Sequence, residues 1–272
     1  MIKVLFAVLT ALPFSFQIAE KKEMKAHARP PLEWVLDAAE QGDAQAQYEL
    51  GARYLRGIDV ELDHAKAVEW YTKAAEQGHP IAQFNLGVCY GEGTGVRKDM
   101  VQSTEWVRRS ALQGFAQAQF ALAINYERGI GVNRDSSQAF AWYAKAAEQG
   151  HAFAQHNLGM CYSKGIGVER DPAKAAEWVE KAAEQGDMLA QCTIGFYYLE
   201  GRGVARDVAK AEKWWRKSAE QGYALAQYDL GTCYENGWGV ERNMAMAAEW
   251  YAKAAAQGHE SAINRLKTLQ DK

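Results

Sequence analysis

Hydrophobic positions recur along this chain at helical spacing, in pairs of short segments separated by glycine-rich turns. In residues 152–163, Ala154, Leu158, Gly159 and Tyr162 fall at i, i+4, i+5 and i+8, which places them on one face of a helix. A second helix is expected to begin after Asp171 and to end at the next Gln-Gly pair. Aspartate is a favoured N-cap and glycine a favoured residue after a helix end. The pattern therefore predicts a helix, a turn and a second helix.

This helix-turn-helix pattern returns at a fixed period of 36 residues. The dipeptide Gln-Gly ends at Gly42, Gly78, Gly114, Gly150, Gly186, Gly222 and Gly258. A period of this size indicates a solenoid, in which each unit packs on its neighbours. We number each repeat from the residue after that glycine, so that six full repeats occupy residues 43–258. Each repeat has a first helix, a turn and a second helix.

Several repeat positions predict how the two helices pack. Position 9 of the first helix is glycine in five repeats and alanine in the third, which indicates a close approach of the second helix. Position 21 predicts the N-cap of the second helix and carries Asp63, Asp99, Asp135, Asp171, Asp207 and Asn243. Position 28 is always tryptophan, and we expect it to fill the space between the helices: Trp70, Trp106, Trp142, Trp178, Trp214 and Trp250.

The array continues beyond the six repeats at both ends. Residues 31–42 read PLEWVLDAAEQG, which is the second helix of a partial N-terminal repeat. Residues 259–272 begin like a first helix, with Ala262 in phase, and then turn polar, as expected of a C-terminal capping helix. The sequence therefore predicts an all-α solenoid of about fourteen helices, following a linker at 20–30.

The first nineteen residues differ from the rest. Lys3 precedes an apolar run at residues 4–16, which is short for a membrane span of about 20 residues but suits a signal peptide over 1–19. We therefore expect an exported protein, periplasmic or secreted from a bacterial envelope, with no stable membrane span once the signal is removed. An uncleaved anchor or a mispredicted start are the alternatives.

The balance of charge bears on nucleic-acid binding, and the spacing of the cysteines bears on disulfide bonds. The chain has 31 basic and 34 acidic residues, whereas nucleic-acid binding usually needs a basic stripe. Cys89, Cys161 and Cys233 share one position in alternate repeats, roughly 20 Å apart if helices pack at about 8–10 Å, well beyond the ~7 Å limit for a disulfide. We expect these three cysteines and Cys192 to be free and buried. A bridge from Cys192 to Cys161 or Cys233 is the alternative, and we expect a monomer.

The recurring residues resemble a known family. The pattern A-Q-x-x-L-G-x-x-Y-x-x-G-x-G-V-x-x-D, followed by A-x-x-W-Y/V-x-K-A-A-E-Q-G, is similar to that of the Sel-one-like repeat family, which is related to the tetratricopeptide repeat. The resemblance covers residues 32–270. It implies a right-handed α-solenoid that binds proteins or peptides as an adaptor, with the first helices facing a concave groove.

No pattern in the sequence indicates catalysis, a metal or a cofactor. A cysteine-rich branch of the same family is linked to β-lactam binding and hydrolysis, but that branch has paired cysteines in each repeat. This chain has no Ser-x-x-Lys and no Lys-Thr-Gly. Its histidines lack metal-ligand spacing, and His79, His151 and His259 stand where the first helix begins, which predicts a capping role. We therefore expect no enzymatic activity.

The candidate binding residues lie on the first helices, on a stripe offset from the core face. Positions 3, 6 and 10 supply Phe84, Val88, Phe120, Ile124, Phe153, His156, Met160, Leu189, Phe196 and Tyr228, and position 14 adds Arg56, Arg128 and Lys164. Apolar residues rimmed by charge favour a protein or peptide partner on the concave face. Two alternatives stay open. The aromatic residues at position 6 can pack neighbouring first helices together, or the chain can be an envelope scaffold contacted on its convex face or its ends.

Overall fold

The computed structural model describes residues 30–270, which form fourteen α-helices and no strand. The helices are α3 (Leu32–Glu40), α4 (Ala44–Arg56), α5 (His64–Glu76), α6 (Pro80–Glu92), α7 (Met100–Leu112), α8 (Ala116–Arg128), α9 (Ser136–Glu148), α10 (Ala152–Lys164), α11 (Pro172–Glu184), α12 (Met188–Glu200), α13 (Val208–Glu220), α14 (Ala224–Asn236), α15 (Met244–Ala256) and α16 (Glu260–Gln270). The predicted all-α solenoid is confirmed. None of these helices is long and apolar enough to span a membrane. The expected leader and most of the linker fall outside the described residues.

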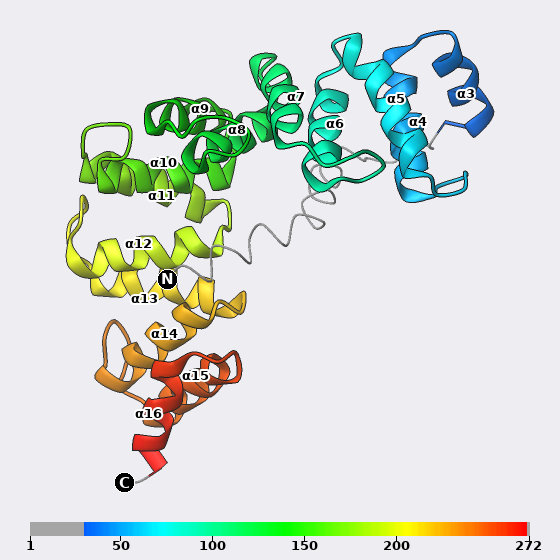
Figure 1. The fold of residues 1–272 in the computed structure, drawn as a ribbon. Coiled ribbons are helices and arrows are strands. Elements are labelled where there is room, and N and C mark those ends of the chain that lie inside the picture. The colour runs from blue at the N-terminus through cyan, green and yellow to red at the C-terminus, as the bar shows by residue number, and fades with distance from the viewer. Residues whose placement is uncertain (1–29, 271–272) are drawn as a thin grey trace.

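The helices stack in chain order. Each packs mainly on the helices before and after it in the chain, so α4 and α5 form the first repeat and α14 and α15 the sixth. Figure 1 shows the stack bent into an arc, with α3 at one end and α16 at the other. The described array therefore begins at α3, ends at α16, and has a concave and a convex face.

The predicted caps are present. The Asp63 side chain accepts a hydrogen bond from the backbone N–H of Lys66 at 3.0 Å, and the aligned residues cap the other second helices in the same way. His79, His151 and His259 cap three first helices through Nδ1. The glycine of each Gln-Gly pair has a positive φ, as at Gly186 with 94°. Local sequence thus sets where each helix begins and ends.

The glycine at position 9 allows the two helices of a repeat to touch. A Cβ atom at Gly195 would lie 2.5 Å from Nε1 of Trp215, and one at Gly159 would lie 2.6 Å from Cγ2 of Val179. The side chain that covers the glycine is therefore at position 29, one residue after the recurrent tryptophan. The expected close approach is confirmed, and the side chain that meets the glycine is the one at position 29.

The recurrent tryptophan packs on its own repeat and on the preceding one. Trp70 packs on side chains of α3 and α4 and stays half-buried, with the Lys73 ammonium 3.8 Å from its ring centroid. Each of the six repeats has this arrangement, with a Lys or Arg three residues after the tryptophan. Of the six tryptophans at position 28, only Trp142 and Trp250 are buried, at 7% and 8% exposed. The tryptophan thus joins repeats to each other.

A ladder of glutamine amides also joins the repeats. Gln191 at position 5 donates to the carbonyl of Ala183 in the preceding repeat at 3.1 Å, and it accepts from Gln221 at the end of its own second helix at 2.8 Å. Gln221 also reaches the carbonyl of Gly186 at 3.1 Å. The two Gln-centred contacts of position 5 recur in all six repeats. The repeat pattern predicted the helix end at Gln221 but not these hydrogen bonds.

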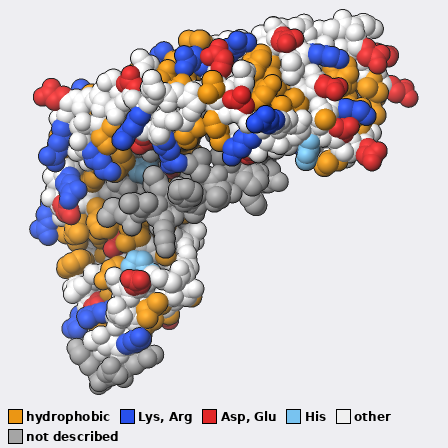
Figure 2. Space-filling model, in the orientation of Figure 1, with side chains coloured by type: hydrophobic (Ala, Val, Ile, Leu, Met, Phe, Trp, Pro, Cys, Tyr) orange, Lys and Arg blue, Asp and Glu red, His pale blue; other side chains and the backbone are white. Residues whose placement is uncertain are grey.

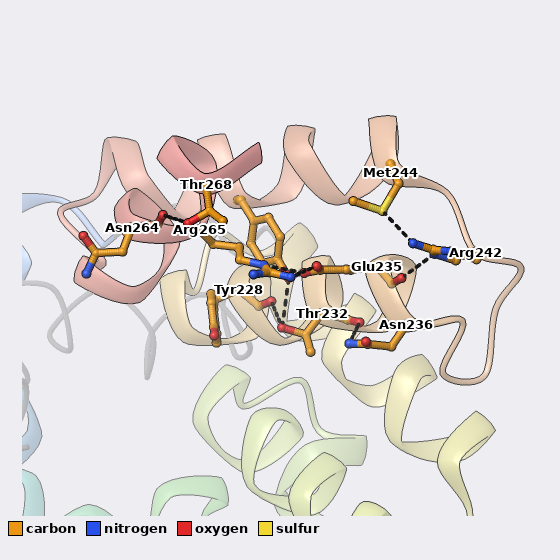
Figure 3. A network of polar contacts seen from close by, with 10 residues as sticks. Tyr228, Thr232, Glu235, Asn236, Arg242, Met244, Asn264, Arg265 and Thr268 are labelled. Atoms are coloured by element: carbon orange, nitrogen blue, oxygen red, sulfur yellow. Dashed lines mark hydrogen bonds and ion pairs between the residues drawn. The ribbon is translucent and has the colours of Figure 1, made fainter. Parts of the chain in front are cut away.

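The two ends of the array differ. At the C-terminal end, α16 buries Ala262 and its Arg265 guanidinium binds the Glu235 carboxylate, which also accepts from the Tyr251 hydroxyl at 2.7 Å. Figure 3 shows this network between α14 and α16. At the other end, the Trp34 side chain on α3 is 60% exposed. The last repeat is therefore capped by polar contacts from α16, whereas the Trp34 ring on the first described helix is exposed.

Candidate functional site

The candidate residues form one surface, which we call the first-helix face: the side chains at positions 3, 6, 10 and 14 of the first helices. Their apolar members are partly exposed, and Phe153 is the most open at 47%. Arg56, Arg128 and Lys164 are exposed at position 14. The core face beside it is closed, since Ala154 and Leu158 are 0% and 1% exposed. The helix pattern therefore separates packing residues from an accessible apolar stripe.

Four contacts between neighbouring first helices are made by stacked or edge-packed rings. The ring at position 6 packs on the ring at position 1 of the next repeat, as Phe120 does on His151 with centroids 4.6 Å apart. The full set is Tyr48–His79, Phe84–Phe115, Phe120–His151 and Tyr228–His259. We call these four contacts the aromatic seams. The aromatic residues at position 6 thus pack neighbouring repeats together and still keep part of each ring accessible.

Histidine has two roles at three of the aromatic seams. The His151 ring stacks on Phe120 while its Nδ1 accepts from the backbone N–H of Ala154 at 3.2 Å. A nitrogen that accepts this bond must be unprotonated. Burial lowers the pKa of His151 to about 4, and burial also lowers the pKa of His79 and His259. These imidazoles are therefore neutral at pH 7, and the predicted capping role is confirmed.

The two remaining contacts between first helices are polar. Between α10 and α12, position 6 is His156, whose Nε2 lies 3.3 Å from Oγ1 of Thr193, and position 1 of the next repeat is Asp187. Between α12 and α14, the Cys192 thiol donates to Oδ2 of Asp229 at 3.9 Å. We call these two contacts the polar seams. They replace ring stacking at position 6, and their partners stand at position 7 of the next first helix.

Both polar seams contain a buried carboxyl group. Asp187 is 8% exposed; its Oδ1 accepts from the backbone N–H of Ala190 at 2.8 Å, whereas its Oδ2 is buried with no hydrogen-bond partner among the described residues. Asp229 is 9% exposed, and burial raises its pKa to about 7. Burial lowers the pKa of His156, the Asp187 carboxylate opposes this shift, and Lys164 adds to it. This part of the first-helix face therefore has a carboxylate oxygen, Oδ2 of Asp187, that accepts no hydrogen bond from the described residues.

Position 10 contributes to packing as well as to the surface. The Phe196 ring meets the Trp215 ring edge-on with centroids 5.2 Å apart, and the Tyr197 hydroxyl lies 4.0 Å from the Met160 sulfur. Both position 10 side chains are still partly exposed. Among the apolar candidate residues, Phe153 is therefore the most exposed, and its ring contacts are with Phe120 and His151.

The four cysteines are free and buried, as the sequence analysis expected. Burial raises the pKa of the Cys89, Cys161 and Cys233 thiols to about 12, and it raises the pKa of Cys192 further. These thiols are therefore protonated at pH 7 and are poor nucleophiles. Within residues 30–270, no three His, Cys, Asp or Glu side chains are grouped in a way that would hold a metal ion.

Comparisons with known proteins give a consistent result. The Sel1 repeat family matches residues 44–79, 80–115, 116–151, 152–187, 189–223 and 224–259. The chain is 44% identical in sequence to c5321, a protective antigen present in uropathogenic Escherichia coli strains, whose crystal structure displays an SLR fold. The two structures match with a TM-score of 0.85 over 89% of this chain and 52% of that one. The chain thus spans about half the length of that relative. A Sel1 repeat protein from Oxalobacter formigenes is 32% identical, with a TM-score of 0.70 over 82% and 96% of the two chains. No curated protein matches.

Proposed function

The chain belongs to the Sel1 repeat family, and from this premise we propose that its first-helix face binds a protein or peptide partner without catalysing a reaction. Sel1 repeats are generally protein-interaction scaffolds. The curvature of the array supports a concave groove lined by the first helices. The cysteine chemistry described above supports the absence of thiol catalysis.

One observation carries the proposal: the accessible apolar stripe centred on Phe153. This ring is 47% exposed. It lies about two helical turns from half-buried Met160 on the same helix, and Leu189 holds the same position in the next repeat. A partly exposed apolar surface with charges at its edge, here Lys164, is typical of an interaction site. Aromatic anchors on such surfaces commonly contribute about 2 kcal/mol or more each to binding.

The test is an affinity purification from the native host with wild-type protein and with the double variant Phe153→Ala and Met160→Ala. We expect a specific partner that the wild type retains and the variant loses, with little change in melting temperature. A matched control changes Val101 and Leu112, which are 63% and 68% exposed on the second helix α7, to alanine. The control variant should bind the partner like the wild type.

Two outcomes would contradict the proposal. Equal retention of the partner by the double variant would place binding elsewhere, and loss with the Val101 and Leu112 control would place it on the second helices. The partner's intact mass should also stay the same after incubation with the protein. A change in that mass would show that the chain modifies its partner.

An end-on scaffold is the second candidate, and Trp34 favours it. In the six full repeats a Lys or Arg covers the equivalent tryptophan, but Asp37 stands at that place in α3. Figure 2 shows acidic side chains gathered over the end of the array formed by α3 to α5. Loss of an assembly on Trp34→Ala, with binding to the first-helix face unchanged, would support this candidate.

We also propose that the protein is exported by a cleaved leader over residues 1–19, from the basic and apolar pattern of that segment. The similar structures come from bacteria. Mass spectrometry of the chain purified from cell fractions tests this proposal. A new N-terminus near residue 20 in the envelope fraction is expected, and an intact Met1 in the cytosol would contradict export.

A further inference from the structure

Two carboxyl groups lie in the wall of the first-helix face, at consecutive polar seams. Asp187 begins α12, and Asp229 stands in the second turn of α14, next to the α12 thiol of Cys192. Each side chain is at least nine-tenths buried. The other four contacts between first helices are made by rings, so the carboxyl groups are confined to one segment of the surface.

Helix capping does not explain the burial of Asp187. Asp43 occupies the same position in the first repeat and caps α4 with Oδ1, 2.7 Å from the backbone N–H of Ala46, while its side chain stays exposed. A cap therefore needs only one carboxylate oxygen in this fold. The second oxygen of Asp187 is buried without a donor, and burial of an unpaired acceptor is unfavourable.

Packing does not explain Asp229 either. Position 7 holds Glu49, Asn85, Ala121, Asn157 and Thr193 in the other repeats, so the fold does not require a carboxyl group there. The hydrogen-bond partner of Asp229 is the weakly donating thiol of Cys192 at 3.9 Å. No lysine or arginine in residues 30–270 forms an ion pair with Asp187 or Asp229. Asp229 thus has a weak thiol donor, and Oδ2 of Asp187 has no donor within residues 30–270, although the His156 imidazole interacts with this carboxylate electrostatically.

We propose that the polar seams bind the ammonium or guanidinium group of a lysine or arginine side chain from the partner. This inference rests on the proposed function and names the chemistry of the peptide. A cation would give Asp187 and Asp229 charge-assisted hydrogen bonds, which are the strongest of those available to a carboxylate. The aliphatic stem of a lysine or arginine would lie along the apolar stripe beside the seams, where Phe153, Met160 and Leu189 are partly exposed. The recognised peptide therefore carries a basic residue flanked by apolar ones.

Selection from a library of displayed random peptides tests this inference on the full chain. Wild-type protein and the double variant Asp187→Asn and Asp229→Asn are used as baits. Asparagine keeps the size of the side chain and caps helices as well as aspartate, so the variant isolates the charge. The control bait is Asp43→Asn, the same change at the exposed position 1 of the first repeat. We expect lysine or arginine between apolar residues to be enriched by the wild type and by the control, and not by the double variant.

The most enriched peptide is then measured by fluorescence anisotropy beside an analogue with norleucine in place of its basic residue. The wild type should bind the analogue about tenfold more weakly or worse, since a charge-assisted contact is lost. The double variant should bind both peptides with the same affinity. If the double variant does not fold, the norleucine comparison on wild-type protein decides whether the basic side chain of the peptide is recognised, and equal binding of both peptides would overturn the inference.

The results separate this inference from the proposed function. Peptides that bind the wild type, lose affinity on Phe153→Ala and carry no basic residue would overturn the inference and leave the proposed function intact. Basic peptides that bind the double variant as tightly as the wild type would also overturn it. If the wild type enriches no peptide, both proposals fail for peptide ligands.

Discussion

The aromatic seams and the polar seams both start from position 6 of the repeat but are built from different chemistry. Phe120 stacks on His151 between α8 and α10, whereas Cys192 meets Asp229 between α12 and α14. The glutamine ladder is the same at both kinds of seam. The difference teaches that the backbone arrangement does not depend on position 6. The first-helix face is therefore free to carry rings in one segment and acceptors in another.

The largest expected effect is on stability, and it separates the two kinds of seam. Phe120→Ala removes a ring that contacts Tyr143, His151 and Phe153, and we expect unfolding to become easier by about 3 kcal/mol. Cys192→Ala removes one sulfur atom at a polar seam and should cost about 1 kcal/mol. Urea unfolding followed by circular dichroism measures both. Equal losses would show that the two kinds of seam support the array equally.

The pH dependence of stability is the next largest effect. The raised pKa of Asp229 means that the folded chain holds a proton that the unfolded chain releases from about pH 4 upward. Stability should therefore fall as pH rises through about 7, by roughly 2–3 kcal/mol between pH 5 and 8. Asp229→Asn should remove this loss. The groups that face Asp229 are Cys192, Tyr223, Cys233 and Tyr251, all uncharged at these pH values. An unchanged pH profile in the variant would show that Asp229 is ionised in the folded chain at pH 5.

An aromatic seam should respond to pH in the opposite direction. His151 has a lowered pKa, so the unfolded chain takes up a proton below its ordinary value of 6.5 while the folded chain does so only near 4. Its contribution to stability should therefore be lost as pH falls through this window, by roughly 1–2 kcal/mol at pH 5. His151→Asn keeps an N-cap and should flatten this part of the profile. Thermal melts of both chains between pH 4 and 8 measure it, and parallel profiles would contradict the assignment.

The smallest effect should be shared by the two kinds of seam. Lys145 lies 4.0 Å from the Trp142 ring centroid beside an aromatic seam, and Lys217 lies 4.1 Å from the Trp214 ring centroid beside a polar seam. Replacing either lysine with methionine should cost about 0.5 kcal/mol, as expected for an exposed cation–π contact. Unequal losses in urea unfolding would show that the difference between the seams extends to the second helices.

The sequence predicts most of the fold because the decisive residues are local and repeated. A cap such as Asp63 acts within one turn, and the contact that requires Gly159 recurs in five repeats, so the 36-residue period displays both. The sequence placed Trp70 between helices but did not show its contact with α3, because periodicity shows that a residue is needed and not which repeat it touches. The glutamine ladder was missed for the same reason.

The candidate site is less visible in the sequence. The burial of Asp187 and Asp229 arises where two neighbouring first helices meet, and each residue occurs once in its register with that environment. No periodic pattern marks such a pair. A departure from the repeat would have been the signal: an acidic residue at position 7, beside a first helix that lacks the usual ring at position 6. The stripe of apolar residues was visible, since it follows the helical period.

The glutamine ladder has a mechanical consequence. Its amides join the end of each second helix to the start of the first helices, so every link lies along one edge of the array, from Gln47 to Gln257. Because this edge repeats the same side-chain hydrogen bonds in every repeat, whereas the contacts at the first-helix face differ from seam to seam, we expect any change in the curvature of the array to keep the spacing at the glutamine edge. The spacing of the first helices at the seams would then change most.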